Sequence, residues 1–198
     1  MTNRFARIAM LSAFASLGAC ASTPASHFYT LSALSTAGTT SADVSIAVGP
    51  VSLPAAVDRP EMVVASGANE LRLDEFNRWA GPLQEELGRV VAENLTTILH
   101  TPRVTQFPQT RNADADYRVA IEVRRFDSTL GKAATLWAVW FVRDTKGDKA
   151  QTGRTEVREP VQDNSYEALA VAHSRAAARL SQDIADAIRT PSIGAGHR

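Results

Sequence analysis

Two segments of the chain carry apolar side chains at the spacing of an amphipathic helix. The first segment begins at Pro82, which suits the first turn of a helix because the N–H groups there have no partner within the helix. It ends at Thr101-Pro102, and Glu85 and Glu86 fit the positive N-terminal end of its dipole. One side of this predicted helix carries Leu83, Leu87, Val90, Val91, Leu95, Ile98 and Leu99.

The second predicted helix covers residues 164–189. Asn164 and Glu167 have the spacing of a variant capping box at its start. Its many alanines permit a close approach to a sheet. The side that we expect to be buried consists of Leu169, His173, Ala176, Leu180, Ile184 and Ala187.

Three strands are predicted between these helices. Apolar and polar residues alternate from Tyr117 to Arg124, which is the pattern of a half-buried strand. Residues 134–142 are apolar on both faces, which predicts a central strand that is covered on both sides or meets a partner. A turn at 144–148 leads to the polar segment 150–158, predicted to return as an edge strand. Short turns of this kind indicate an antiparallel meander.

Shorter strands are predicted near the start of the domain. Residues 27–31 form the first, and residues 44–54 form another that Gly49-Pro50 interrupts. The segments 61–65 and 70–73 flank Ser-Gly-Ala-Asn and predict a hairpin, and a last short strand covers 104–107. We therefore predict an α+β fold, with a mostly antiparallel β-sheet and two long amphipathic helices packed on one face.

The first nineteen residues have the pattern of a secretory signal peptide. Arg4 and Arg7 precede an apolar run from Ile8 to Ala19. That run is shorter than the about 20 apolar residues that a membrane-spanning helix needs. We therefore expect residues 1–19 to be removed as a lipoprotein signal peptide.

The segment Leu17-Gly18-Ala19-Cys20 resembles the lipobox of bacterial lipoproteins, in which the cysteine thiol receives lipid. Cys20 is therefore the predicted lipidation site, carrying fatty chains such as palmitate. The alternative is a small apolar cysteine near the cleavage site of a secreted protein. Against it, a lone thiol in an oxidising compartment is a liability.

The predicted mature chain has three parts. Residues 20–26 are the lipidated cysteine and a short tether, residues 27–190 form a single domain, and residues 191–198 form a frayed tail. Within the domain, residues 32–43 are rich in Ser, Thr, Ala and Gly and predict a loop or linker.

The charge and the cysteine content exclude several classes of protein. The chain has 21 basic and 21 acidic side chains, so it lacks the clustered excess of Lys and Arg that nucleic-acid binding requires. Without Arg4 and Arg7 of the signal peptide, 19 basic side chains remain against 21 acidic. A single cysteine excludes an internal disulfide framework and any multi-cysteine metal site.

The sequence predicts no enzyme and no cofactor or metal. It contains no H-E-x-x-H, G-x-S-x-G, G-x-G-x-x-G or C-x-x-C motif. The histidines His27, His100, His173 and His197 are scattered, and the paired acidic residues fit solvated turns better than a catalytic dyad. A hydrolase with a dispersed site would need the fold to bring His27, His100 or His173 beside both a nucleophile and a carboxylate.

Two further groups of residues are candidates for a binding surface. Arg118, Arg124 and Arg125 are expected on the water-facing side of their strand, with an anion site as the alternative. Trp137 and Trp140 lie on opposite faces of one strand, so one is expected in the core and the other toward the helices, a groove or a partner.

Several motifs follow one another along the chain. After the lipobox come Phe28-Tyr29-Thr30-Leu31, the segment 48–54, Val57-Asp58-Arg59-Pro60 and the segment 76–83, which reads Phe-Asn-Arg-Trp-Ala-Gly-Pro-Leu. This order resembles that of the PqiC family of ABC-type transport auxiliary lipoproteins. Pro60 favours an extended Arg59 before the next strand. The candidate partner-contact or structural residues are Arg59, Pro60, Arg78, Trp79, Pro82, Trp137 and Trp140.

This resemblance implies a role in the envelope. Members of the family are outer-membrane-anchored periplasmic partners of MCE-domain proteins and of ABC transporters that move lipids between the two membranes. They are non-catalytic accessory subunits, and the family supplies no catalytic residue to carry over. Ala21, in place of Asp after the cysteine, also favours the outer membrane.

Two alternatives stay open. The first is a periplasmic lipid-binding lipoprotein that holds an acyl chain between helix and sheet. The second concerns assembly, because an open edge of the meander at 150–158, or the first strand, is free to pair with a second copy of the chain.

Overall fold

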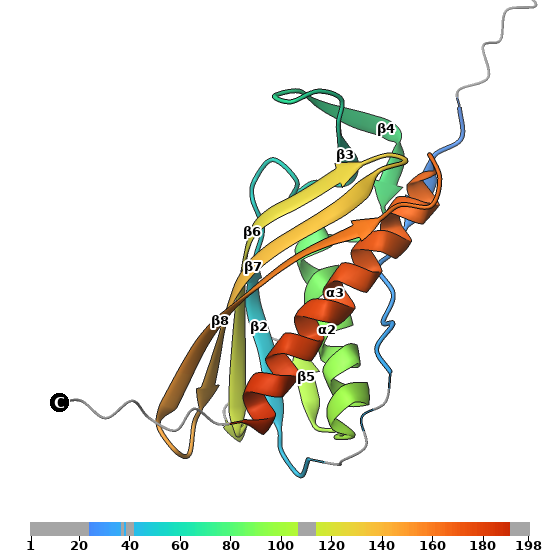
Figure 1. The fold of residues 1–198 in the computed structure, drawn as a ribbon. Coiled ribbons are helices and arrows are strands. Elements are labelled where there is room, and N and C mark those ends of the chain that lie inside the picture. The colour runs from blue at the N-terminus through green and yellow to red at the C-terminus, as the bar shows by residue number, and fades with distance from the viewer. Residues whose placement is uncertain (1–23, 37, 39–41, 107–113, 191–198) are drawn as a thin grey trace, which may run out of the picture.

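The structure is a computed structural model that describes residues 24–36, 38, 42–106 and 114–190. The predicted signal peptide, Cys20 and the predicted tail at 191–198 lie outside the described residues. Figure 1 shows two helices lying across one face of a long twisted sheet, with a smaller sheet at one end.

The larger sheet has five strands in the order β5-β2-β6-β7-β8. The predicted meander is confirmed, because β6 pairs with β7 and β7 with β8 in antiparallel register. Strand β2 is parallel to both β5 and β6. The strands are β2 (Ile46–Ser52), β5 (Val104–Gln106), β6 (Tyr117–Thr129), β7 (Ala133–Asp144) and β8 (Lys149–Pro160).

The smaller sheet has three strands, in the order β1-β4-β3. The predicted hairpin is confirmed as the antiparallel pair β3 (Glu61–Ala65) and β4 (Leu71–Trp79). Strand β4 runs further than predicted, as far as the tryptophan at its end. Strand β1 (His27–Tyr29) lies parallel to the last three residues of β4.

The predicted α+β fold, mostly antiparallel with two long helices, is confirmed, and three shorter pairings within it are parallel. The structure has two mixed sheets. The parallel pairs arise because the chain passes through a helix between β2 and the strands on either side of it, β5 and β6. A connection that crosses the sheet in this way returns the chain in the same direction.

Both predicted helices are present, as α2 (Leu83–Leu99) and α3 (Tyr166–Arg189). Every residue of the two predicted apolar sides is buried. The predicted start of α3 is wrong: the cap is Ser165, whose side chain accepts a hydrogen bond from the backbone N–H of Ala168. Asn164 lies one residue before this cap.

The helices cover one face of the larger sheet. Helix α2 packs on β2 and β5, α3 packs on β7 and β8, and the helices contact each other. The inner face of β7 is buried, whereas Trp137 and Val139 on its outer face are half-buried and Phe141 is 44% exposed. Strand β7 is therefore a central strand, as predicted, and of the two predicted alternatives full cover holds for its inner face only.

The interruption predicted at Gly49-Pro50 is a local irregularity within one strand. Pairing of β2 with β6 stops at Val48 and resumes at Val51. Gly49 has a φ of 121°, a conformation that favours glycine.

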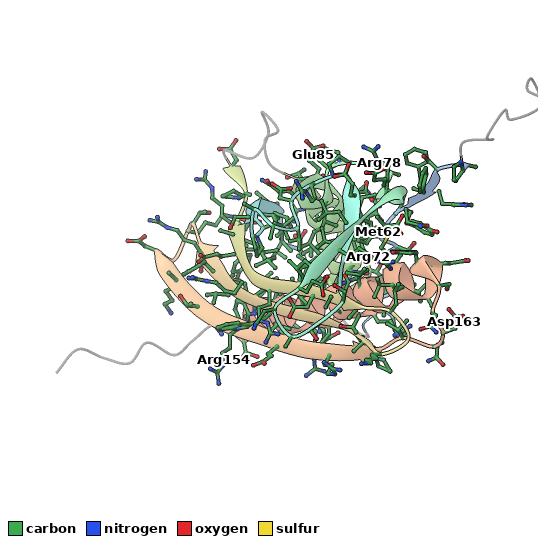
Figure 2. All side chains as sticks on the ribbon, turned by 90° about the horizontal axis from the view of Figure 1, so that it is seen from above. Met62, Arg72, Arg78, Glu85, Arg154 and Asp163 are labelled. Atoms are coloured by element: carbon green, nitrogen blue, oxygen red, sulfur yellow. The ribbon has the colours of Figure 1, made fainter. Side chains whose placement is uncertain are left out.

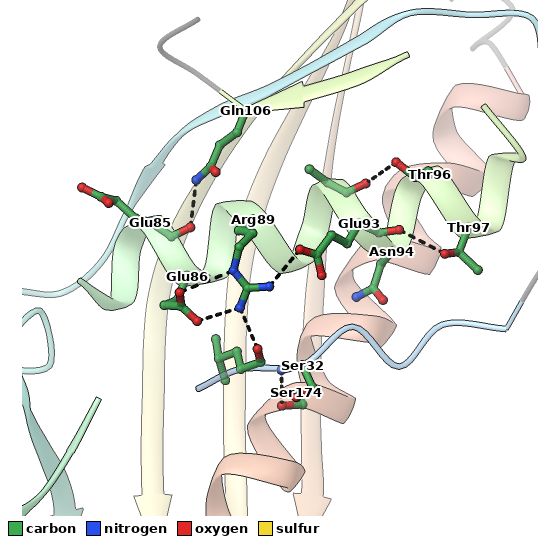
Figure 3. A network of polar contacts seen from close by, with 12 residues as sticks. Ser32, Glu85, Glu86, Arg89, Glu93, Asn94, Thr96, Thr97, Gln106 and Ser174 are labelled. Carbon is green, nitrogen blue, oxygen red and sulfur yellow. Dashed lines mark hydrogen bonds and ion pairs between the residues drawn. The ribbon is translucent and has the colours of Figure 1, made fainter. Parts of the chain in front are cut away.

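The segment after β1 is a loop, as predicted, and it is fastened to both helices. Ser32 donates its backbone N–H to Ser174 Oγ of α3, and Asn94 Oδ1 of α2 accepts from the backbone of Leu34 and Ser35. Arg89 of α2 donates to the carbonyl of Leu31 while it is held by two glutamates of its own helix, which raise the pKa of Arg89 (Figure 3). The start of the domain is thereby fixed to the helix layer.

Candidate functional site

Five of the seven residues singled out in the sequence surround one cavity. This cavity of about 580 Å³ lies where the smaller sheet meets the start of α2. We call it the motif cavity, and its lining includes Phe28, Arg59, Pro60, Arg78, Trp79 and Pro82. Motifs that are up to 54 positions apart in the chain, from Phe28 to Pro82, thus form one surface.

Backbone hydrogen bonds bring the three motif segments together. Trp79 donates its N–H to the carbonyl of Pro60, and Ala80 donates to the carbonyl of Tyr29, both at 2.8 Å. In the parallel pairing of β1 with β4, Phe28 lies beside Arg78. Strand pairing and these two backbone hydrogen bonds therefore hold the cavity-lining segments in fixed positions.

Trp79 supplies the floor of the motif cavity. Its side chain is 4% exposed. The indole makes edge contacts with Phe126 and His173, with ring centroids 6.2 and 6.3 Å apart. A ring held in this way anchors the smaller sheet to the core, so Trp79 shapes the cavity more than it contacts a ligand.

The rim of the motif cavity is aromatic and cationic. Phe28 is 63% exposed, so its ring is accessible at the rim. Arg59 and Arg78 lie 3.9 and 3.4 Å from the carboxylate of Glu61, and both guanidinium groups are partly exposed. This arrangement suits contact with a protein or a lipid and offers no acid–base pair.

A polar cluster fixes the smaller sheet to the start of α3. Tyr166 donates its hydroxyl hydrogen to Asp74, and Asn77 bridges Asp74 and Tyr29. Burial, together with the hydrogen bond to Asp74, raises the pKa of Tyr166 to about 12. Burial opposes ionisation of Asp74, but hydrogen bonds from Tyr166 and Asn77 hold its pKa below the usual range. The cluster positions β1 and β4, and through them the motif cavity.

The two tryptophans of β7 lie on opposite faces, as the alternation predicts, and neither lines the motif cavity. Trp140 is the core residue, and its indole N–H donates to Thr155 Oγ1 at 3.2 Å. A Cβ added at Gly153 would lie 2.0 Å from its ring, so glycine is required opposite it. Trp137 is half-buried on the outer face of the sheet.

The three arginines of β6 are exposed, as expected. Arg124 pairs with Glu122 at 3.0 Å, and Arg125 pairs with Asp127 at 2.9 Å. Arg124 and Arg125 also line a second cavity of about 590 Å³ between the β3–β4 hairpin and the meander. We call it the hairpin groove. Arg118 is not part of its lining.

The histidines do not assemble a hydrolytic site in the part of the chain that the structure describes. His173 Nε2 lies 2.8 Å from Ser128 Oγ, but its Nδ1 has no partner, so the carboxylate of a triad is missing. The imidazole stacks on Phe126, and burial lowers the pKa of His173 to about 3, which makes it a poor base. His27 is exposed on β1, and His100 ends α2.

The described residues include neither a metal-binding cluster nor a helix suited to cross a membrane. No cluster of three or more His, Cys, Asp or Glu side chains there is arranged to hold a metal ion. None of the described helices combines the length and the apolar composition that crossing a membrane requires.

Sequence reasoning did not single out Phe28 as a site residue or find the hairpin groove. A strand of three residues is too short for alternation to show which side chain is exposed. The groove joins segments from both sheets, and only their packing brings its walls together.

Comparisons with known proteins agree on the fold. The family model of the ABC-type transport auxiliary lipoprotein component matches residues 29–185. Protein XCC0632 from Xanthomonas campestris, of the DUF330 family, is 20% identical with a TM-score of 0.67, over 80% of this chain and 92% of its own. An uncharacterized protein of known structure is 16% identical with a TM-score of 0.66, over 83% and 99%. No curated protein matches the sequence.

Proposed function

Because the chain belongs to the family of ABC-type transport auxiliary lipoprotein components, we propose that it is a non-catalytic accessory subunit of an MCE/ABC-type system for lipid transport between membranes. In this proposal it is anchored at Cys20 to the periplasmic face of the outer membrane. It binds the transport machinery there and contributes to the integrity of the envelope.

The position of β1 relates the anchor to the motif cavity. Cys20 lies seven positions before His27, the first residue of β1. An extended chain spans at most about 3.6 Å per residue, so this tether reaches about 25 Å. Since Phe28 belongs to β1 and lines the motif cavity, a lipidated Cys20 keeps that cavity near the membrane.

One observation carries the proposal of a docking role: three of the four motif segments meet at a single cavity whose rim is aromatic and cationic. Protein interfaces are enriched in aromatic residues, Phe included, and in Arg, and Arg is also frequent among the few residues that dominate the binding energy. Phe28 offers an exposed ring, and Arg59 and Arg78 keep donors available beyond their shared carboxylate. We propose that the partner in the transport system contacts this rim.

Affinity purification of the full-length protein from crosslinked membranes tests the proposal. The wild-type protein is expected to recover MCE-domain and ABC transporter subunits, and Arg78→Glu is expected to lower that recovery at least fivefold. The matched control is Arg143→Glu, an exposed arginine of β7 outside the motif cavity. Recovery of no such subunit by the wild-type protein contradicts the proposal, and equal losses in both variants contradict the proposed surface.

A separate experiment tests the anchor. The Cys20→Ala variant is expected to leave the outer-membrane fraction. Its thermal unfolding should match that of the wild-type protein, because Cys20 precedes the domain. If the wild-type protein is exported without acyl chains, the anchoring proposal is wrong.

The alternative of an acyl chain held between helix and sheet gains no support from the cavity found at that position. The cavity where Ala187 of α3 meets β6, β7 and β8 has a volume of about 20 Å³. That is room for about one water molecule. Two cavities with far more room lie elsewhere, the hairpin groove of about 590 Å³ and the motif cavity of about 580 Å³.

A further inference from the structure

The hairpin groove separates the two sheets of the domain. Its volume of about 590 Å³ is in the range of about 300–1,000 Å³ typical of small-molecule sites. Figure 1 shows the β3–β4 hairpin projecting past one end of β6 and β7, so the groove has one wall from each sheet.

The hairpin wall is mainly apolar. It is formed by Val63 and Ala65 of β3, Leu71 of β4 and the loop residues Pro54 and Val57. Val63 is buried, whereas Leu71 is 55% exposed. Together with the other apolar lining residues they give the groove a wall that an apolar group can cover.

The opposite wall is mainly polar and carries three arginines. Arg124, Arg125 and Arg158 line it, and the acidic residues of the whole lining are Glu70 and Asp127. The lining therefore has an excess of one positive charge. Arg158 forms no ion pair with any residue that the structure describes.

The ion pairs on this wall leave the arginines available to a ligand. The side chains of Arg124 and Arg125 are 52% and 53% exposed, and exposed pairs contribute about 0–1 kcal/mol. An exposed guanidinium that gives two donors to a carboxylate keeps others, and its planar geometry matches a phosphate. Reorienting these side chains toward an anion is therefore inexpensive.

An apolar wall opposite a cationic wall matches an amphiphile with an anionic headgroup. We propose that the hairpin groove binds one anionic phospholipid, with the phosphate at Arg124, Arg125 and Arg158 and part of an acyl chain along Val63 and Leu71. The inference rests on the proposed function for the presence of lipid at the site. It extends that function by giving the accessory subunit a lipid site of its own.

Native mass spectrometry of the delipidated full chain with added phosphatidylglycerol tests this site. The wild-type protein is expected to bind one phosphatidylglycerol, and Leu71→Asp and Arg158→Glu are each expected to weaken binding at least tenfold. Leu73→Asp and Arg154→Glu are the matched controls, expected within twofold of wild type. Leu73 is exposed two residues along β4, and Arg154 lies four residues along β8, on the face away from the helices (Figure 2); neither lines the groove.

Each outcome decides the inference. The inference is supported if only the groove variants lose phosphatidylglycerol binding. The wild-type protein should then bind no inorganic phosphate and should bind phosphatidylcholine more weakly than phosphatidylglycerol. The inference is overturned if Arg158→Glu binds the lipid as tightly as the wild-type protein does, or if the control variants lose as much binding as the groove variants. It is also overturned if only an acidic peptide displaces the bound lipid. Leu71 and Arg158 are exposed, so unfolding curves that match wild type show that the variants fold. The partner purification described above reports on the proposed function separately, because it requires no lipid in the groove.

Discussion

The backbone N–H of Trp79 donates a hydrogen bond to the carbonyl of Pro60 across 2.8 Å, and this contact joins two of the motif segments. The indole then extends beneath the motif cavity to Phe126 and His173 in the core. The same residue therefore builds the cavity and fastens the smaller sheet to the rest of the domain.

Trp79→Ala is expected to lower the free energy of unfolding by about 3–5 kcal/mol, because it removes a buried aromatic side chain and leaves a void. Arg78→Ala, at the neighbouring position on the cavity rim, is expected to cost about 1 kcal/mol or less, since its ion pair with Glu61 is partly exposed. Urea unfolding of the two variants measures both values. Similar losses of unfolding free energy in the two variants would contradict the assignment of Trp79 to the floor and Arg78 to the rim.

Gly153→Ala is expected to destabilise the domain by about 1–3 kcal/mol, because the added Cβ would lie 2.0 Å from the ring of Trp140. Gly81→Ala is the control, since its Cβ would meet no atom closer than 3.6 Å. Combining Gly153→Ala with Trp140→Leu should show a coupling that relieves the clash. Thermal unfolding of all four variants tests this, and additive losses would argue against a direct contact.

Asn94→Ala is expected to release the loop that follows β1. The buried side chain accepts hydrogen bonds from the backbone of Leu34 and Ser35, so its removal leaves both amides without their partner. Hydrogen exchange of peptides covering residues 31–36 should accelerate at least tenfold, with little change in β6 and β7. Thr97→Ala, on the exposed side of the same helix, should leave that exchange unchanged.

His173 is expected to make the stability depend on pH. Burial lowers its pKa to about 3 in the folded state, against 6.5 in the unfolded chain. Between these values only the unfolded state takes up the proton, so stability falls as the pH drops below 6.5, by about 1.4 kcal/mol per pH unit. At pH 5 the loss reaches about 2 kcal/mol relative to pH 7.5.

The comparison of wild type with His173→Gln isolates this effect. The difference in unfolding free energy between the two proteins should shrink by about 2 kcal/mol from pH 7.5 to pH 5. Urea unfolding at four pH values measures it, and the other histidines contribute equally to both proteins. A difference that stays constant with pH would show that the pKa of His173 is the same in the folded and unfolded states.

The periodicity of apolar residues predicted the helices and the meander correctly, because the helices and the sheet bury one face against each other. The apolar side from Leu83 to Leu99 and the alternation from Tyr117 to Arg124 each indicate which side chains are buried. Strand direction did not follow, because the parallel pairing of β2 with β5 and β6 depends on the path through α2. The cap of α3 was misplaced by one residue, since Asn164 and Ser165 are both good capping residues.

The sequence motifs indicated most residues around the motif cavity, but they did not predict that these residues surround a cavity. Arg59, Pro60, Arg78, Trp79 and Pro82 were singled out from their order in the chain, but their meeting at one cavity depends on how β1, β3 and β4 pair. Trp137 and Trp140 were chosen for their aromatic character, and the fold places them elsewhere. No sequence motif around Arg158 or Leu71 indicates a binding site, because the groove forms only when the two sheets pack together.

Site-specific photo-crosslinking from position 28 tests the central claim most directly. A benzophenone amino acid replacing Phe28, on the rim of the motif cavity, is compared in living cells with the same replacement of Phe141, an exposed residue on the outer face of β7. We predict that position 28 crosslinks to an MCE-domain or ABC transporter subunit and that position 141 does so at least fivefold less. Efficient capture of such a subunit from position 141 with none from position 28 would contradict the account.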